Sequence, residues 1–326
     1  MDIIGNENAL AAVDALLSSG RTPHSIVIYG EKGLGKRSLA KYIAARMLCK
    51  SAAASPCGIC RSCVMLARGG HPDFIQVQPS LKSGAYKLDE DLRFVTADAV
   101  TAPNESSVKI YLIADMDKTP VGSQNALLKL IEEPPDHVVI ILTASSREYF
   151  LPTILSRVIA IGMSPVTAEQ CAEYLKKHSS HSSEEIAEAV SAMGGNIGMC
   201  LEYLESKGLR AAAETARLAA KAAADRNEYE LMKALSVCDK DRELTVSMLK
   251  LLQNIFRDAY LAALGCTIEN CGCCAEASEK MAASLSVSKL GELCSLSEKY
   301  IFRINANAGL QLCLCSLCAD IKNITG

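Results

Sequence analysis

The sequence has no long apolar run and no strong excess of charge of either sign. No stretch reaches the roughly 18 consecutive apolar residues that a membrane-spanning helix requires. The segment Met1–Glu7 is acidic and has no apolar centre, so we also expect no export signal. The formal net charge of -3 argues against a broad nucleic-acid-binding surface on this chain alone. We therefore expect a cytoplasmic protein, whose 326 residues and 49% hydrophobic content suffice for two or three domains.

Cysteine is abundant, with 15 residues in the chain. Without export we expect reduced thiols or metal ligands and not disulfides. Two overlapping C-x-x-C turns and a further cysteine lie in one short segment that contains Pro and Gly: Cys49, Cys57, Cys60 and Cys63. Four thiolates can close a tetrahedral site, which predicts a structural Zn²⁺, with four free thiols as the alternative. A second group suits one tetrahedral site less well because two members are adjacent, and its role stays open: Cys266, Cys271, Cys273 and Cys274.

A glycine-rich segment, Gly30–Arg37, has the sequence G-E-K-G-L-G-K-R between a β-branched run at Ser25–Tyr29 and a predicted helix at Lys36–Leu48. Strand, loop and helix are the context of the phosphate-binding loop G-x-x-x-x-G-K-[ST], in which the final hydroxyl binds Mg²⁺. The candidate phosphate-binding residues are Gly30, Gly33, Gly35 and Lys36. Arg37 replaces the hydroxyl, and Ser38 lies about 100° further round the helix. We expect a loop that can hold ATP or ADP but is poorly suited to metal-assisted hydrolysis.

Four more short β-branched runs alternate with helical or loop segments, at Phe74–Gln78, Val108–Ile113, Val138–Thr143 and Val158–Ile161. This alternation predicts a parallel sheet with helices on both faces. After about Thr167 the strand patterns stop and only helical patterns follow. We therefore predict an α/β P-loop domain at 1–165 with the cysteine segment at 49–63, a small helical lid at 166–207 and an all-helical domain at 208–326.

Further motifs follow the loop and the cysteine segment in a characteristic order: Gly70–Asp73, then N-A-L-L-K-L-I-E-E-P-P at Asn125–Pro135, then Thr153–Arg157. In this order the motifs resemble the bacterial clamp-loader family of AAA+ ATPases, which comprises the gamma/tau and delta prime subunits of DNA polymerase III. The similarity covers most of residues 1–205, and the N-A-L-L-K run is its most specific part. More weakly, residues 256–258 and 305–312 resemble the helical collar of these subunits.

The resemblance also shows which ATPase parts this chain lacks. Active members end the strand that corresponds to Lys109–Ile113 with an Asp-Glu pair that supports Mg²⁺ and activates water, whereas this chain has Ala114 and Asp115. Active members carry a lid arginine in a G-x-x-R pattern, where this chain has Gly195–Gly198. Together with Arg37, these departures favour a delta-prime-like subunit without intrinsic ATPase activity.

The chain retains Ser156 and Arg157, which in the family form an arginine finger that reaches the ATP site of a neighbouring subunit. The resemblance implies a hetero-pentamer with gamma/tau and delta subunits that loads the sliding clamp onto primer-template DNA in replication. Two other interpretations stay open. One is an ATP-hydrolysing gamma/tau-like motor that uses Asp115 and Ser38, and the other is a zinc-dependent nucleic-acid-binding module with a vestigial loop.

Overall fold

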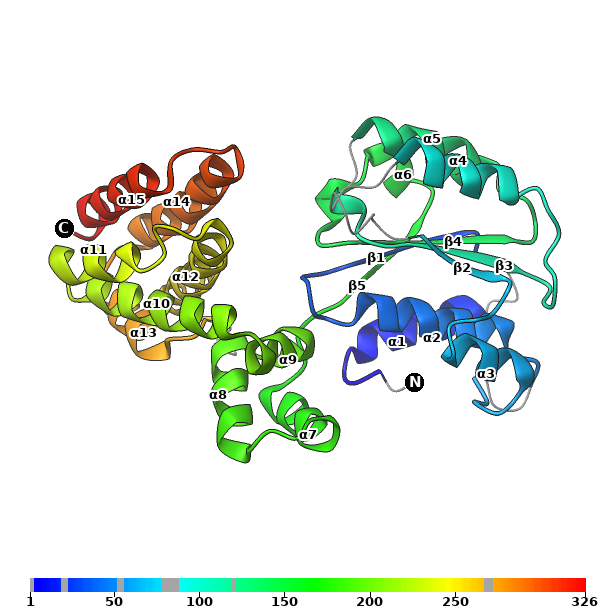
Figure 1. Ribbon diagram of the computed structural model, residues 1–326, viewed down its shortest axis with the longest axis horizontal. Helices are drawn as coiled ribbons and strands as arrows, with labels where there is room; N and C mark the ends of the chain where they lie inside the picture. The colour runs from blue at the N-terminus through cyan, green and yellow to red at the C-terminus, as the bar shows by residue number, and fades with distance from the viewer. Residues whose placement is uncertain (1–2, 19–22, 52–55, 78–87, 119–120, 267–271) are drawn as a thin grey trace. The chain divides into compact units, whose positions relative to one another are not determined.

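The computed structural model describes residues 3–18, 23–51, 56–77, 88–118, 121–266 and 272–326. The chain forms two compact units, Met1–Ser164 and Pro165–Gly326, which are coloured blue to green and green to red (Figure 1). The first unit holds the predicted α/β domain. The division of the second unit into a lid and a collar at about residue 207 stays a prediction.

The first unit is built on five parallel strands in the order β2-β3-β4-β1-β5. The strands are β1 (Ser25–Tyr29), β2 (Phe74–Val77), β3 (Lys109–Ile113), β4 (Val138–Ala144) and β5 (Ile159–Gly162). Val27 of β1 lies opposite Leu142 of β4 and Ala160 of β5. The predicted parallel sheet is therefore confirmed, while the expected strand residue Gln78 lies outside the described residues.

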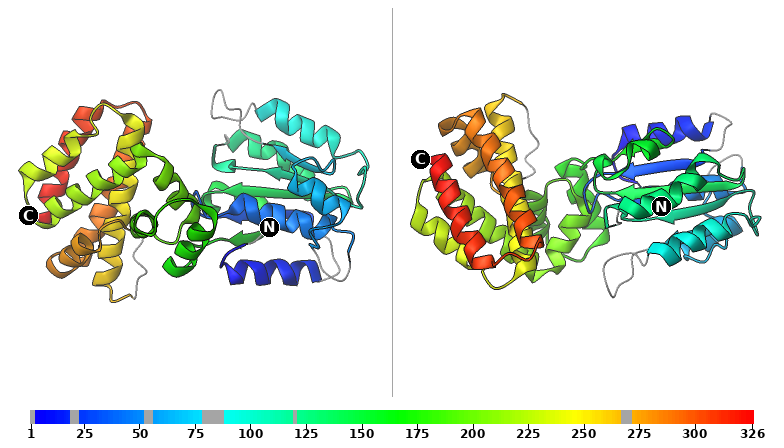
Figure 2. Two further views of the ribbon diagram at one scale, coloured as in Figure 1. Left: turned by 60° about the horizontal axis from the view of Figure 1, so that its bottom comes forward. Right: turned by 90° about the horizontal axis from the view of Figure 1, so that it is seen from above.

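Helices cover both faces of this sheet (Figures 1 and 2). One face packs against α1 (Glu7–Ser18), α2 (Lys36–Leu48) and α3 (Arg61–Ala67). The other packs against α4 (Leu88–Asp98), α5 (Val121–Glu132) and α6 (Pro152–Leu155). Successive residues of β1 belong to the two different cores, since side chains alternate across a strand: Ile26 and Ile28 face the first core and Val27 the second. Burial of β1 on both faces explains its apolar run Ile26–Ile28.

The described residues of the second unit form helices and their connections. They are α7 (Ala168–His178), α8 (Ser183–Met193), α9 (Ile197–Glu205), α10 (Lys207–Ala224), α11 (Glu228–Ser236), α12 (Arg242–Ala263), α13 (Ala275–Ser284), α14 (Val287–Asn305) and α15 (Leu310–Thr325). Helices α7 and α8 begin with capping boxes at Thr167 and Ser182. Within the part of the chain that the structure describes, no helix has the length and apolar character needed to cross a membrane.

Candidate functional site

The glycine-rich loop leaves the carboxyl end of β1, which lies between β4 and β5, and leads directly into α2. Gly35, the residue before α2, has a φ of 86°, a left-handed conformation that favours glycine. A Cβ atom on Gly30 would lie 2.7 Å from the carbonyl oxygen of Met163, so the loop can approach the chain after β5 only with glycine there. The loop therefore lies at the carboxyl edge of the sheet, where open parallel sheets bind their ligands.

Lys36, the first residue of α2, lies back across this loop. Its Nζ donates hydrogen bonds to the carbonyl oxygens of Gly30 at 2.6 Å and Glu31 at 2.8 Å. Burial lowers the pKa of the Lys36 ammonium, and the carboxylates of Asp115 and Asp117 partly oppose that shift. A phosphate group bound by the loop would have to share or replace the carbonyl contacts of this lysine.

Arg37 and Asp115 form an ion pair with 2.7 Å between Nη2 and Oδ2. Asp115 follows β3 after Ala114 and has a φ of 57°, a conformation that aspartate tolerates better than most residues. Its backbone N–H donates to Oγ1 of the buried Thr143 on β4 at 3.0 Å. By the resemblance described above, the ion pair joins the two positions that correspond to a metal-binding hydroxyl and a water-activating carboxylate.

These side chains do not fit a Mg²⁺ site of the usual kind. Mg²⁺ requires oxygen ligands at about 2.0 to 2.1 Å in a nearly octahedral arrangement. Arg37 presents a cation at one of the expected positions and Ala114 a methyl group at the other. The guanidinium of Arg37, paired with Asp115, therefore stands at the position where the phosphate-binding loop motif has a metal-binding hydroxyl.

Arg157 follows α6 on an exposed part of the first unit. Its Nη1 donates to the carbonyl oxygen of Thr153 and to Oγ of Ser156, both at 3.0 Å. Oγ of Ser156 in turn donates to the carbonyl oxygen of Thr153 at 2.9 Å. Nη2 of Arg157 lies 3.2 Å from Oε1 of Glu132, the last residue of α5. Ser156 therefore orients the guanidinium, and Glu132 neutralises it.

Hydrogen bonds from α5 hold the backbone at Tyr149 and Leu151, shortly before Arg157 in the chain. The buried side chain of Gln124 donates from Nε2 to the carbonyl oxygen of Tyr149 at 2.7 Å and accepts the N–H of Leu151 at 3.1 Å. Ile154 of α6 is fully buried in the same core as Leu127 of α5. The sequence indicated the N-A-L-L-K run as a family marker, but assigned no role to Gln124 or Glu132. Their partners lie on a different element, and no local pattern predicts such contacts.

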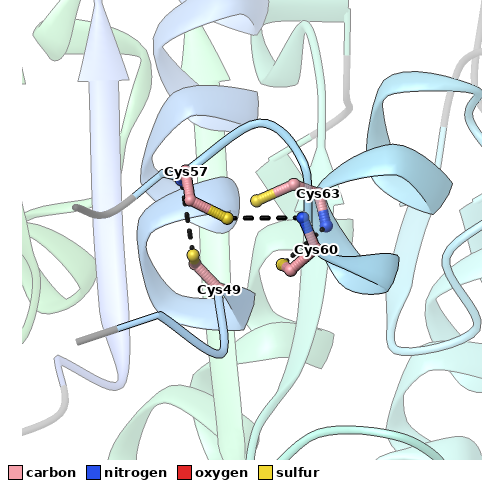
Figure 3. Close-up of side chains that lie close together, drawn as sticks. All are labelled: Cys49, Cys57, Cys60 and Cys63. Carbon is pink, nitrogen blue, oxygen red and sulfur yellow. Dashed lines mark hydrogen bonds between the residues drawn. The ribbon is translucent and has the colours of Figure 1, made fainter. Parts of the chain in front are cut away.

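The four cysteines of the predicted zinc site come together between α2 and α3. Cys49 follows α2, Cys60 precedes α3, and Cys63 lies in the first turn of α3. Their sulfur atoms point toward a common centre and all lie within 4.8 Å of one another (Figure 3). The sulfurs of a tetrahedral Zn²⁺ site with Zn–S bonds of about 2.3 Å are roughly 3.8 Å apart, so this set fits such an ion.

Backbone N–H groups surround these sulfurs. The N–H of Cys57 lies 3.4 Å from Sγ of Cys49, that of Cys60 lies 3.4 Å from Sγ of Cys57, and that of Cys63 lies 3.5 Å from Sγ of Cys60. The last of these contacts contributes most to lowering the pKa of Cys60 to about 6. Burial raises the pKa of Cys63 to about 12. A cation would offset that cost of burial, because it favours the thiolate form of all its ligands.

The second cysteine group is not assembled in this way among the residues that the structure describes. Cys273 and Cys274 are buried, Cys266 is exposed, and Cys271 lies outside the described residues. Within the described ranges, the four cysteines between α2 and α3 form the group of potential metal ligands with the required proximity. In the second unit, Gly198, which the resemblance aligns with a lid arginine, lies in the first turn of α9.

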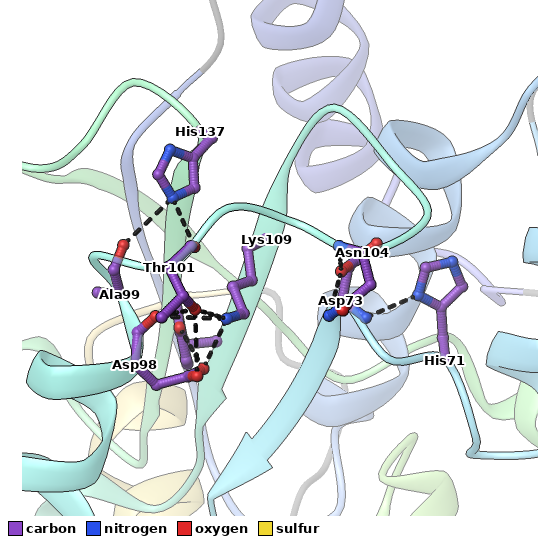
Figure 4. A network of polar contacts seen from close by, with 9 residues as sticks. His71, Asp73, Asp98, Ala99, Thr101, Asn104, Lys109 and His137 are labelled. Atoms are coloured by element: carbon purple, nitrogen blue, oxygen red, sulfur yellow. Dashed lines mark hydrogen bonds and ion pairs between the residues drawn. The ribbon is translucent and has the colours of Figure 1, made fainter.

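A network of buried charges lies at the amino ends of β2, β3 and β4 (Figure 4). Asp73 accepts the backbone N–H groups of Asn104, Glu105 and Ser106 at 2.5, 2.8 and 2.8 Å. Burial opposes ionisation of Asp73, but these three bonds together lower its pKa. Lys109, which is 3% exposed, pairs with Asp98 at 2.8 Å. Because the glycine-rich loop lies at the opposite, carboxyl edge, we interpret this network as a framework for the connection before β3.

The strand β1, the glycine-rich loop and α2 define a P-loop protein. Comparison with known proteins identifies the group: residues 5–167 match the family described as "DNA polymerase III, delta subunit", and the chain belongs to this family of clamp-loader subunits. DNA polymerase III subunit delta' of Pseudomonas aeruginosa is 31% identical over 188 residues, which are 57% of this chain and 57% of that protein. DNA polymerase III subunit tau of Escherichia coli is 32% identical over 176 residues, which are 54% of this chain and 27% of that protein.

Solved structures include a DNA polymerase III gamma subunit-related protein of Thermotoga maritima, which aligns over 98% of this chain and 99% of its own. Its sequence identity is 16% and its TM-score is 0.42, so the family assignment depends on the sequence matches and not on this likeness. The predicted fold class and family are confirmed. Both delta' and tau subunits are among the relatives, so the matches alone do not separate these two kinds of subunit.

Proposed function

We propose that this chain is a delta-prime-type subunit of a DNA polymerase III clamp loader and does not hydrolyse ATP itself. The observation that carries the proposal is the ion pair of Arg37 with Asp115, 2.7 Å long, next to a loop that keeps Lys36. Phosphoryl transfer depends on metal ions that neutralise charge and on a group that orients the attacking water. Here the guanidinium of Arg37 stands at the position of the metal-binding hydroxyl. The carboxylate of Asp115, which could orient water, is paired with that guanidinium.

In this proposal the catalytic contribution of the chain is Arg157, acting on ATP bound by an adjacent subunit. Its side chain is 42% exposed, and Gln124 anchors the preceding backbone at Tyr149. A guanidinium held on a rigid, accessible element can approach phosphate oxygens of a partner and stabilise charge in the transition state. Ser156 would orient it through the hydroxyl contact at 3.0 Å.

The proposal also includes partner subunits and a structural metal ion. The other members would be gamma/tau and delta subunits in a hetero-pentamer, which acts on the sliding clamp and on primer-template DNA in the cytoplasm. Structural Zn²⁺ would be held by the four thiolates, of which Cys49 lies at the opposite end of α2 from the glycine-rich loop. Bound ATP or ADP would contact Gly30, Gly33, Gly35 and Lys36 without being turned over.

Substitution of Arg157 by Ala in the reconstituted complex tests this function. We expect folding, zinc content and assembly to be unchanged, and ATP hydrolysis with clamp and primed DNA to fall. An arginine finger contributes about 10³ to 10⁵ in rate at its own site, but the other ATP sites of the complex conceal part of that loss. The expected result is therefore a partial fall in ATPase rate and a larger fall in clamp loading.

The matched control is Arg147→Ala, which removes another exposed arginine from the first unit. Its complex should hydrolyse ATP and load clamps at the rate of the unaltered complex. Equal clamp-dependent ATPase and loading in the Arg157→Ala and unaltered complexes would show that this chain supplies no finger and has only an architectural role.

A further inference from the structure

The guanidinium of Arg157 is already bound by groups of its own chain, which a phosphate would have to displace or share. Nη1 is engaged by the Thr153 carbonyl and the Ser156 hydroxyl, and Nη2 is engaged by Glu132 at 3.2 Å. Phosphate recognition by arginine typically uses two parallel N–H groups along one edge of the guanidinium. The carboxylate of Glu132 therefore competes with a phosphate for Nη2.

The location of Glu132 supports a role beyond local structure. It is the last residue of α5, where the partial negative charge of the helix end disfavours an acidic side chain. Arg157 lies at this same helix end and offsets both the carboxylate and the helix dipole. The two side chains are 42% and 44% exposed, so their attraction is weak and an incoming anion can replace the carboxylate.

We propose that Glu132 is a positioning residue that restrains Arg157 in a resting place and is displaced when the guanidinium binds phosphate oxygens on the neighbouring subunit. This inference rests on the proposed function of Arg157 in trans. In the resting complex the restraint lowers the fraction of Arg157 that is free to act. When clamp and DNA bring the subunits together, the phosphate outcompetes the carboxylate.

The test uses the full-length chain in the reconstituted complex, with Glu132→Gln as the variant. Glu133→Gln is the matched control, since it makes the same change in charge at the next, also exposed, residue. We expect Glu132→Gln to raise the basal ATPase kcat, measured without clamp and DNA, by up to about fivefold, the limit for an exposed ion pair. KM should be unchanged, because ATP is bound by the neighbouring subunit. The stimulation by clamp and DNA should fall by the same factor.

A double variant separates release of the finger from other effects. The gain from Glu132→Gln should disappear in Glu132→Gln/Arg157→Ala, which should match Arg157→Ala alone. A Glu132→Gln rate equal to or below that of Glu133→Gln, or a gain that persists without Arg157, would overturn the restraint. If Arg157→Ala still slows the complex in that case, the finger stands and only the restraint is wrong. If Arg157→Ala has no effect, the proposed function itself fails.

Discussion

Arg37 lies in the first turn of α2, where its guanidinium reaches Asp115 across the carboxyl edge of the sheet. In the proposed function the same chemical group has a different role in Arg157, which follows α6, is exposed to a similar degree and lies 3.2 Å from Glu132. A guanidinium cannot lose its charge in a protein, so its surroundings decide whether it blocks a metal site or offers a charge to a partner. In both cases the partner is an acidic residue that is distant in sequence.

At this scale we expect that Arg37→Thr alone does not create an ATPase. The substitution restores a hydroxyl, but Ala114 still provides no carboxylate for the metal. The melting temperature should change little, because an ion pair with an arginine that is 43% exposed contributes about 1 kcal/mol or less. Phosphate release by the isolated wild-type and Arg37→Thr chains, with Lys36→Ala as background, is the measurement. Turnover by the wild type that Lys36→Ala abolishes would favour a gamma/tau-like motor instead.

The segment between α2 and α3 has little apolar surface of its own to bury. Of the four cysteines only Cys63, in the first turn of α3, is buried, and Ile59 is 86% exposed. Without a core, a short connection of this kind depends on a cross-link or a metal for a defined conformation. Arg61, at the start of α3, pairs with Glu105 at 2.8 Å and so connects the segment to the loop that Asp73 organises.

We therefore expect roughly one equivalent of zinc in the purified protein and its loss in Cys60→Ser. The variant should lose order in the segment 49–63 but keep the sheet, whose core lies on other residues. Cys315→Ser, at an exposed cysteine of α15, is the control and should keep its zinc. Elemental analysis and circular dichroism provide the two measurements. Protein purified without chelator that contains no zinc would contradict the assignment.

For the whole molecule, the two compact units separate two tasks in the proposed function. The unit Met1–Ser164 carries the glycine-rich loop, the cysteines and Arg157, while the described residues of Pro165–Gly326 provide helices and no comparable metal-ligand group. In the second unit, α12 is the longest helix, and α10, α13 and α14 pack against it. We expect this helical unit to provide most of the contact with other subunits, through the predicted collar at 208–326.

The corresponding prediction concerns assembly. The full-length chain, carrying an affinity tag in its own organism, should co-purify with gamma/tau and delta subunits, and the Arg157→Ala variant should do so to the same extent. The physical reason is that a finger contacts nucleotide, whereas the collar buries helix surface between subunits. Mass spectrometry of the captured proteins is the measurement. Capture of neither subunit would contradict a clamp-loader role more strongly than any single substitution.

The sequence by itself determined the features that depend on short-range order. Short runs of β-branched and other apolar residues predicted the strands, because strands buried on both faces have continuous apolar sequences, and apolar residues that recur about every 3.6 positions predicted the main helices. The close spacing of Cys57, Cys60 and Cys63 predicted a metal site, and the order of motifs indicated the family. These inferences needed no knowledge of which strands are neighbours.

Only the tertiary structure decided which charges meet. Arg37 and Asp115 are 78 residues apart, and they form a pair because β1 and β3 both lie beside β4 in the sheet. Glu132 reaches Arg157 because Gln124 and the core residues of α5 hold α6 in place. Ion pairs between distant segments depend on the packing of whole elements, and no local pattern encodes them. For that reason the partners of the two arginines could not be predicted from the sequence, whereas the departures from the ATPase pattern at Arg37, Ala114 and Gly198 are visible in the sequence itself.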